Sequence, residues 1–328
     1  MQNKIVWIHS YDTRIKGGGV FMFQQLDYLK KFNIQVTVHY LSRLFNPIIF
    51  LSNYFKLRIA HREHIVHAQY GSGTAFFTSL LITKKKIVSI RGSDWYTLSG
   101  EVSLQEKLRS KISHFLTLIS LNRFDEIIVM SERMKMELTI ANANIEQKIR
   151  VVTDGIDLDM FYPIDKVSAK NSLGFELSRF LVGVGSIVEG NPIKRISLVK
   201  KAVEILSVNY PIELFVLTDI EHSEMNLYVN CCDVIVLTSI YEGWPNIIKE
   251  GLACNVPFIS TDVSDLHLIT NDKSSGCFIT SDNVEHLAHL ILDMYKAKVS
   301  GKNWDTRKFV LSFELSKTLM SLISSYKI

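Results

Sequence analysis

Long hydrophobic runs are absent from this sequence of 328 residues. No uninterrupted apolar run reaches the roughly 18 residues that a membrane-spanning helix needs. The apolar stretch at the amino terminus is also too short for a secretory signal peptide. We therefore expect neither a spanning helix nor a cleaved leader.

Cysteine is scarce as well, and low-complexity segments are missing. The four cysteines lie in or beside apolar runs without the spacing of a zinc site, at Cys231, Cys232, Cys254 and Cys277. Reduced thiols in the cytoplasm explain this placement most simply. Hydrophobic residues make up 47% and charged residues 21%, which indicates a well-packed globular protein. The length fits two domains better than one core.

Acidic residues are under-represented in the first half. Residues 1–155 contain 21 Lys+Arg against 12 Asp+Glu, a balance of +9, and the remainder contains 16 against 21. Basic residues frame apolar segments at 43–58, 84–86 and 107–121. This framing suits an anionic membrane surface, and solvated lysines beside buried helices would explain it equally well. Nucleic acid is disfavoured, because neither a helix-turn-helix pattern nor an aromatic-basic RNA signature accompanies the charge.

Strand and helix patterns alternate along the whole chain, which predicts parallel sheets with helices on both faces. A turn-rich connector at 154–163 marks a break between two such sheets, and residues 309–326 have the pattern of one or two amphipathic helices. The predicted strands are 5–9, 34–39, 65–69, 87–90, 126–130, 149–153, 180–185, 213–218, 233–237, 256–260 and 277–280.

Two glutamates flank one predicted junction between a strand and a helix. The run Val234–Leu237 is short, apolar and β-branched, as expected for a strand covered on both faces. Glu242 follows its carboxyl end, where open α/β sheets bind ligands. Pro245 suits the first position of the next helix, which places Glu250 in the second turn. Asn255 stands where a helix commonly ends on a left-handed residue.

The start of this helix is suited to anions. The amides of Asn246 and Ile247 are predicted to be unpaired there, and Gly243 allows a ligand to approach the backbone closely. Two carboxylates beside such a site suit a ligand with both hydroxyls and phosphates, such as a sugar nucleotide. A solvated glutamate pair around an ordinary turn is the alternative.

With these residues in place, the chain resembles a bacterial glycosyltransferase of family four, also described as glycosyl transferases group 1. Motifs in the family's order are Gly17-Gly18-Gly19, Ile90–Asp94, Val151–Asp157, Pro192–Arg195 and the Glu242/Glu250 element. The resemblance implies an α/β protein of GT-B architecture, in which two Rossmann-like parallel-sheet domains face an interdomain cleft. It implies an acceptor-side domain over residues 1–155 and a nucleotide-sugar-binding domain over 156–309, with a helix at about 310–328 packing back on the first.

The resemblance also implies roles for single residues. Glu250 would accept hydrogen bonds from the ribose, Glu242 would hold hydroxyls of the transferred sugar, and Lys194 would neutralise the departing diphosphate. The implied catalytic residues are Lys194, Glu242 and Arg91, and the implied donor-binding residues are Glu250, Gly243, Trp244, Asn246, Ile247, Gly18, Gly19 and Arg195. The glycine run lacks the third glycine of a dinucleotide fingerprint and the Lys-Ser/Thr of a Walker loop, and a plain turn is its alternative.

Several positions depart from the family pattern. An arginine usually found shortly before the lysine is replaced by Ser186 or Asn191, depending on the alignment. Arg91 stands where many relatives have a histidine, and Asp154 where an asparagine is more usual. Because arginine keeps a fixed positive charge, we hypothesise that Arg91 partly replaces the missing cation.

The activity implied is that of a retaining hexosyltransferase in cell-surface polysaccharide synthesis. It would move a sugar from a nucleotide-diphosphate donor to a hydroxyl of a saccharide or lipid-linked acceptor, with no cofactor and no metal. The expected location is the cytoplasm, with the N-terminal domain peripheral on an anionic inner membrane face. Two alternatives stay open: a non-catalytic glycosyltransferase-like partner subunit, motivated by the missing arginine, and a GT-B sugar-nucleotide epimerase or hydrolase.

Overall fold

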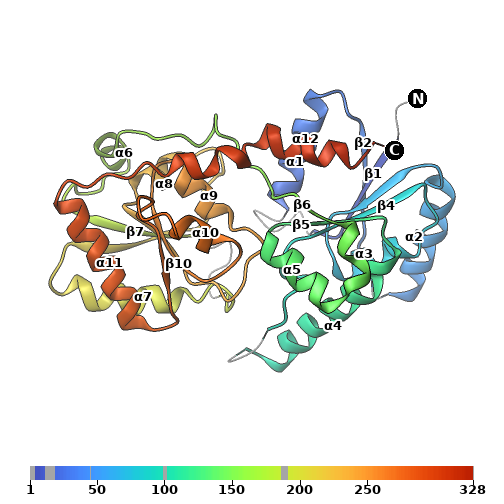
Figure 1. The fold of residues 1–328 in the computed structure, drawn as a ribbon, viewed down its shortest axis with the longest axis horizontal. Coiled ribbons are helices and arrows are strands. Elements are labelled where there is room, and N and C mark those ends of the chain that lie inside the picture. The colour runs from blue at the N-terminus through green and yellow to red at the C-terminus, as the bar shows by residue number, and fades with distance from the viewer. Residues whose placement is uncertain (1–3, 12–18, 45, 99–101, 186–190, 328) are drawn as a thin grey trace. The chain divides into compact units, whose positions relative to one another are not determined.

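The chain folds into two compact units, each built on one parallel sheet (Figure 1). The computed structural model describes residues 4–11, 19–44, 46–98, 102–185 and 191–327. The first unit comprises Met1–Gly155 and Ser316–Ile328, and the second comprises Ile156–Leu315. Each of the eleven predicted strands is present, with bounds within two residues of those expected.

The first unit contains a six-stranded sheet in the order β2-β1-β3-β4-β5-β6. The strands are β1 (Ile5–His9), β2 (Val36–Tyr40), β3 (Ile65–Ala68), β4 (Lys85–Ile90), β5 (Glu126–Val129) and β6 (Ile149–Val151). The helices between and after them are α1 (Val20–Lys31), α2 (Pro47–Ala60), α3 (Ser72–Ser79), α4 (Leu104–Ser120), η1 (Leu121–Arg123), α5 (Glu132–Ala141) and η2 (Ala143–Lys148). β1 lies between β2 and β3, so the chain reverses direction across the sheet at β1.

Side chains of β1 alternate between the two faces, as a strand requires. Val6 and Ile8 lie in a buried cluster with Leu57 of α2 and Phe77 of α3. Trp7 belongs to the opposite face. Figure 1 shows α2, α3, α4 and α5 on one side of the sheet, and α1 with α12 (Leu315–Ser324) on the other. The sheet is therefore covered on both faces.

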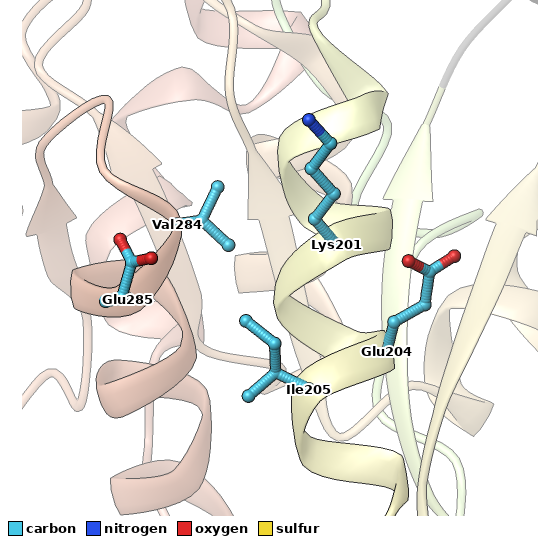
Figure 2. Close-up of a pocket in the computed structure, with 5 residues that line it drawn as sticks. All are labelled: Lys201, Glu204, Ile205, Val284 and Glu285. Carbon is cyan, nitrogen blue, oxygen red and sulfur yellow. The ribbon is translucent and has the colours of Figure 1, made fainter.

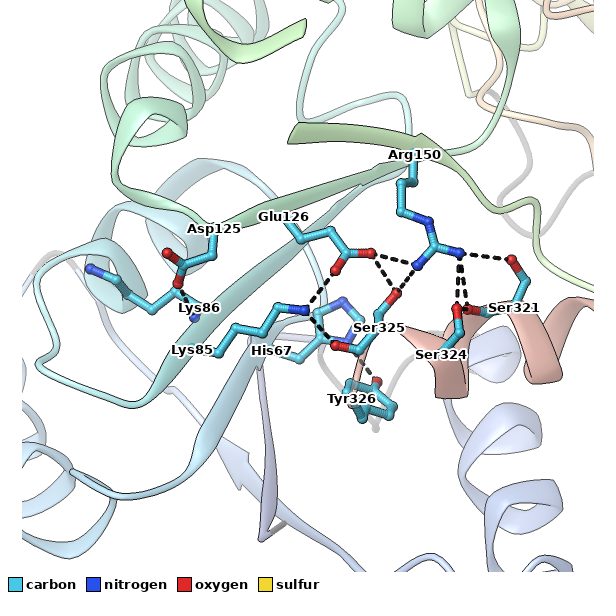
Figure 3. Close-up of polar contacts among 10 residues, drawn as sticks. All are labelled: His67, Lys85, Lys86, Asp125, Glu126, Arg150, Ser321, Ser324, Ser325 and Tyr326. Carbon is cyan, nitrogen blue, oxygen red and sulfur yellow. Dashed lines mark hydrogen bonds and ion pairs between the residues drawn. The ribbon is translucent and has the colours of Figure 1, made fainter. Parts of the chain in front are cut away.

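The C-terminal segment is anchored to the first unit by buried polar contacts. The Tyr326 hydroxyl accepts a hydrogen bond from Trp7 Nε1 at 2.9 Å and lies 2.8 Å from His67 Nδ1. Glu126 binds Lys85 Nζ and Arg150 Nη1, both at 2.9 Å, and accepts from Ser325 Oγ at 2.5 Å (Figure 3). The segment thus contacts five strands of the first sheet, β1, β3, β4, β5 and β6.

The second unit contains a five-stranded sheet in the order β11-β10-β9-β7-β8. The strands are β7 (Phe180–Gly185), β8 (Ile212–Leu217), β9 (Val234–Leu237), β10 (Phe258–Thr261) and β11 (Phe278–Thr280). The helices are α6 (Lys166–Ser172), α7 (Ile196–Ser207), α8 (Met225–Cys231), α9 (Asn246–Ala253), α10 (Leu266–Thr270), α11 (Val284–Val299) and η3 (Arg307–Phe313).

The core of the second unit lies on both faces of β7. Val182 and Val184 pack with residues of α7 and α11, and Leu181 packs with Ala169 of α6 and Cys231 of α8. Figure 1 shows α7 and α11 below this sheet and α6, α8 and α9 above it. Because both faces are covered, β7 and β9 at the centre of the sheet consist of apolar residues and glycine, as expected for such strands.

The four cysteines are all buried and unpaired. Burial raises the pKa of Cys231 to about 11 and the pKa values of Cys254 and Cys277 to about 12. Such thiols are unreactive near neutral pH. In the part of the chain that the structure describes, no helix is both long and apolar enough to cross a bilayer.

Candidate functional site

The predicted site residues of the second unit lie around the topological switch point of its sheet. The chain runs from β7 to β8 on one side and returns to β9 on the other, so the segments after β7 and β9 leave neighbouring strands at the same edge. In open parallel sheets, ligands bind outside the carboxyl ends of the strands at this point. Lys194 comes from the segment after β7, and Glu242 from the segment after β9.

The fold brings Lys194 and Glu242 together although 48 positions separate them. Lys194 Nζ lies 2.5 Å from Glu242 Oε1, which also accepts a hydrogen bond from Ser239 Oγ at 2.6 Å. The side chains keep 25% and 16% of their exposure. An ammonium has three N–H donors, and among the described residues only Glu242 takes one of them. Lys194 can therefore hold Glu242 and a phosphate oxygen at once.

Thr238 fixes the turn that carries Lys194. Its hydroxyl donates to the carbonyl oxygens of Lys194 and Arg195, at 2.8 and 3.0 Å. The Ile240 amide adds a bond to Ile193 O at 2.9 Å. The turn begins at Asn191, whose side chain accepts from the Ile193 amide at 3.0 Å. This asparagine is thus used within the turn, and Ser186 lies outside the described residues.

The Arg195 side chain contacts the protein around it. Its Nε donates to Thr238 O at 2.8 Å, and Nη1 lies 2.7 Å from the Asp282 carboxylate. The backbone of Arg195 is left-handed, with φ of 45°, directly before α7. These contacts favour a role in positioning Lys194, which precedes it. The prediction that Arg195 binds the donor stays a prediction.

Helix α9 presents Glu250 and free backbone amides. The helix starts at Asn246, with Pro245 as its N-cap. The sequence predicts Pro245 as the first helical residue, so the helix begins one residue later than predicted. No side chain caps this end, and the amides of Asn246 and Ile247 have no hydrogen-bond partner among the described residues. The amides and the helix dipole make this end favourable for anions.

The pKa of Glu250 differs from that of an ordinary glutamate. Burial raises its pKa to about 7, and the charge of Lys249 opposes that rise only in part. Within the described residues, no hydrogen bond reaches its carboxylate. A partly buried carboxylate without a donor is costly to ionise, and hydroxyl groups of a ligand would supply the missing hydrogen bonds. Glu250 is therefore prepared to accept from a polyol such as ribose.

Three residues near the two glutamates, Trp244, Ile247 and Gly243, contact the surrounding protein. The Trp244 ring is buried against Phe313, with ring centroids 4.8 Å apart, and therefore offers a ligand little beyond its backbone. Ile247 packs over Gly185 at the end of β7, where an added Cβ would come within 2.9 Å of it. The Gly243 carbonyl accepts from Ser264 Oγ at 2.6 Å. These contacts fix the backbone whose amides face the site.

The end of α9 has the predicted left-handed residue. Asn255 has φ of 59°, and its amide bonds to Leu252 O at 3.1 Å. Val256 N completes the motif by donating to Gly251 O at 2.8 Å. The Asn255 side chain accepts from the amides of Thr306 and Arg307, at 3.1 and 2.9 Å. The termination of α9 thus also anchors the chain leading into η3.

In the first unit, only part of the glycine run can be described. Gly19 is left-handed, with φ of 73°, and directly precedes α1. A Cβ there would lie 3.0 Å from the Tyr11 ring. Both features require glycine at this position. Gly17 and Gly18 lie outside the described residues. The loop follows β1, and β1 with β3 forms the switch point of the first sheet.

Arg91 lies after β4, and its charge is already paired within the first unit. Its Nη1 binds the Asp154 carboxylate, and Nη2 donates to Gln69 Oε1 at 3.0 Å. The guanidinium stacks on Phe21, 4.0 Å from the ring centroid. Burial works to lower the pKa of Arg91, but Asp154 outweighs this effect and raises it. The two departures from the family pattern are therefore partners of each other, and whether Arg91 also replaces a phosphate cation stays a hypothesis.

Sequence reasoning missed the residues that hold the site residues in place. Thr238 and Ser239 directly follow the apolar run of β9. Their position at the carboxyl end of a strand could have indicated that they lie at the site. Gln69 and Gln25 hold the Arg91–Asp154 pair, and neither stands in a motif.

A pocket on the second unit is separate from the predicted residues. It lies between α7 and α11 and is lined by Lys201, Glu204, Ile205, Val284 and Glu285 (Figure 2). It includes none of the predicted site residues. Within the described ranges, no group of three His, Cys, Asp or Glu side chains is placed to hold a metal ion.

Comparisons with known proteins relate the chain to glycosyltransferases. Residues 182–297 match the family model of glycosyl transferases group 1. This segment includes Lys194 and both glutamates. An uncharacterized glycosyltransferase of Methanocaldococcus jannaschii is 25% identical over 89% of this chain and 85% of that protein. The chain spans about half the length of D-inositol 3-phosphate glycosyltransferase of Mycobacteroides abscessus, which is 24% identical over 62% of this chain and 51% of that protein.

Solved structures show the same fold. A glycosyltransferase from Rickettsia africae superposes with a TM-score of 0.74 at 16% identity, covering 100% of this chain and 98% of that one. Anabaena HepE in complex with UDP gives 0.71 at 13% identity, over 98% and 99% of the two chains, and HepE has also been solved with UDP-glucose. The predicted GT-B architecture of two Rossmann-like units is confirmed, and the family model and relatives show that the chain is similar to glycosyltransferases.

Proposed function

We propose that this protein is a retaining hexosyltransferase that moves a sugar from a nucleotide-diphosphate donor to a hydroxyl of a saccharide or lipid-linked acceptor. The pathway proposed is cell-surface polysaccharide synthesis on the cytoplasmic side of the membrane. The observation that carries the proposal is the Lys194–Glu242 ion pair, 2.5 Å long, at the switch point from which the chain continues into α9 with its unpaired first amides and Glu250.

Each group of a nucleotide sugar has a counterpart in this arrangement. The Glu250 carboxylate would accept from the ribose hydroxyls, and Glu242 would accept from hydroxyls of the transferred sugar. The amides of Gly243, Asn246 and Ile247 would lie near the diphosphate, where the helix dipole favours negative charge. Lys194 would stay on Glu242 with one N–H and bind the leaving phosphate with another. HepE, a structural neighbour solved with UDP-glucose, supports a donor of this class.

The proposed step exchanges one bond at the anomeric carbon for another on the same face. The bond from this carbon to the phosphate oxygen breaks as the bond to the acceptor oxygen forms, and the acceptor's proton passes to the departing phosphate. No protein base is needed, so catalysis rests on positioning and on stabilising the charge that develops on the diphosphate. No metal enters this scheme, and independence from metals stays a prediction.

A product assay tests the proposal. A thermal-shift screen of nucleotide sugars selects the donor, which is then incubated with a pool of free and lipid-linked saccharides in the presence of EDTA. We expect a glycoside whose anomeric configuration, read by NMR, equals that of the donor.

Each other outcome contradicts a part of the proposal. An inverted product would exclude retention, and loss of transfer in EDTA would exclude the metal-free scheme. Free sugar or an epimer as the main product would favour a hydrolase or epimerase. Tight donor binding without turnover over the whole pool would favour a non-catalytic partner subunit.

A further inference from the structure

Helix α4 turns polar residues toward the protein and large apolar residues toward solvent. Its buried residues are polar: Ser110, Thr117 and Ser120. Its outward side chains are large and apolar, with exposed fractions of 83% for Leu104, 59% for Leu108, 40% for Ile112, 58% for Phe115 and 40% for Ile119. A surface helix of a globular protein normally has the opposite arrangement. The outer face of α4 therefore suits an apolar environment that the chain itself does not provide.

Hydrogen bonds fix α4 in this orientation. Thr117 Oγ1 donates to Asp94 O and accepts from the Ser72 amide, both at 2.7 Å. Ser110 Oγ accepts from the Leu98 amide at 3.0 Å, and His114 Nδ1 lies 2.5 Å from Trp95 O. The polar face is thus bound to the protein in detail. Rotating the helix to bury its leucines would break all of these bonds.

The exposed apolar residues of α4 form one straight stripe. Their spacings of four, four, three and four residues keep them within about 80° of the helix circumference, since each residue turns by about 100°. The stripe runs roughly 22 Å along the helix at 1.5 Å per residue. Lys107 and Lys111 border it along one side, and Arg109 lies beyond its other side. The only acidic residue in α4, Glu106, is engaged in the capping box with Ser103.

Helix α2, on the same side of the sheet, also exposes apolar residues, although its buried face is apolar as well. It contains no acidic residue, carries Lys56 and Arg58, and buries only Leu57 fully. Its exposed apolar residues are Ile48 at 78%, Leu51 at 52%, Phe55 at 56% and Ile59 at 82%. Both helices contact α3, α2 through Phe50 on Phe77 and α4 through Thr117 on Ser72. Figure 1 shows α2 and α4 on one side of the first sheet.

We propose that the outer faces of α2 and α4 rest on an anionic lipid surface. The apolar side chains would enter the acyl boundary, and the bordering lysines and arginines would extend to the headgroups. Charge favours lipid over a second copy of the chain, because two copies would bring the same basic borders together. Binding to lipid would not depend on sugar transfer, although a surface-bound enzyme would reach a lipid-linked acceptor directly.

Vesicle co-sedimentation of the full chain, without donor or acceptor, tests this surface. We expect binding to phosphatidylcholine vesicles that contain one quarter phosphatidylglycerol, weaker binding at high salt, and little binding to phosphatidylcholine alone. Lys107→Gln with Lys111→Gln should weaken binding roughly thirtyfold, because each basic residue near an anionic leaflet contributes about fivefold. Leu108→Ser with Phe115→Ser should weaken it at least about tenfold on the same vesicles.

A matched control keeps the test specific. Ile205 and Val208 are exposed apolar residues of the second unit, at 53% and 79%, and Ile205→Ser with Val208→Ser should leave vesicle binding unchanged. All of the replaced apolar side chains are exposed, so every variant should keep its circular dichroism spectrum. Absence of binding to anionic vesicles, or binding that the α4 substitutions leave intact, would overturn the proposal. A dimer in sedimentation velocity that Leu108→Ser with Phe115→Ser converts to monomer would assign the surface to a second copy instead.

Discussion

Replacing Lys194 with alanine should lower kcat on the order of a thousandfold. A cation about 4 Å from a phosphate oxygen, at an effective dielectric of about 20, contributes roughly 4 kcal/mol. Each 1.4 kcal/mol that is realised only in the transition state changes the rate about tenfold. The charge on the leaving diphosphate grows as the sugar departs, so most of this contribution should fall on kcat and less on KM. Steady-state kinetics with the selected donor measures both.

Two controls separate this role from a general loss of charge. Lys201 is exposed on α7, seven positions after Lys194, and Lys201→Ala should leave kcat within about twofold. Lys194→Arg keeps the charge and should retain more activity than Lys194→Ala. A kcat for Lys194→Ala within tenfold of the native value would contradict the assignment. An effect confined to KM would assign Lys194 to ground-state binding.

Replacing Asp233 with alanine should destabilise the second unit by about 3–5 kcal/mol. Asp233 has 5% exposure and lies directly before β9. Its carboxylate binds Lys170 Nζ at 3.0 Å, Lys166 Nζ at 3.3 Å and Lys298 Nζ. Burial works to raise its pKa, but the three lysines outweigh that effect and hold the pKa below its usual value. Removing the carboxylate leaves Lys170, with 2% side-chain exposure, as an uncompensated buried charge.

Urea unfolding with hydrogen exchange of the β7 and β9 peptides measures this effect. Exchange in these strands should accelerate, because the Leu181 amide also loses its 2.8 Å bond to Asp233 Oδ2. The matched control is Glu213→Ala, which removes an exposed partner 3.9 Å from Arg179 and should cost less than about 1 kcal/mol. A cost below 1 kcal/mol for Asp233→Ala would mean that the lysines reach water without it.

The course of the backbone could be predicted from the sequence because its signals are local. The β-branched run of β9, the helical spacing of α9 and the left-handed Asn255 each depend on a few neighbouring residues. The sequence placed Pro245 inside the helix, whereas the structure uses it as the N-cap, since a ring without an N–H suits either position.

The pairing of side chains could not be predicted in the same way. Lys194 meets Glu242 only because β7 and β9 are neighbours in a sheet whose strand order skips β8. Arg91 and Asp154 each depart from the family pattern, and the sequence alone does not indicate that they form an ion pair with each other. Trp244 is predicted to bind the donor because it lies next to the Glu242 turn. Its burial against Phe313 depends on a segment almost 70 positions later in the chain, which local signals do not reveal.

Donor titration at two pH values tests whether Glu250 and its neighbours form a nucleotide-sugar site. A carboxyl group with a pKa of about 7 is roughly one-tenth ionised at pH 6 and nine-tenths ionised at pH 8, and only the ionised form accepts from both ribose hydroxyls. The diphosphate of a nucleotide sugar does not titrate in this range. We expect the donor affinity to be about tenfold higher at pH 8 than at pH 6. A Glu250→Gln variant should bind the donor weakly at both pH values, while Glu204→Gln on α7 should behave as the native protein. Donor affinity that Glu250→Gln leaves unchanged would exclude Glu250 from the donor site.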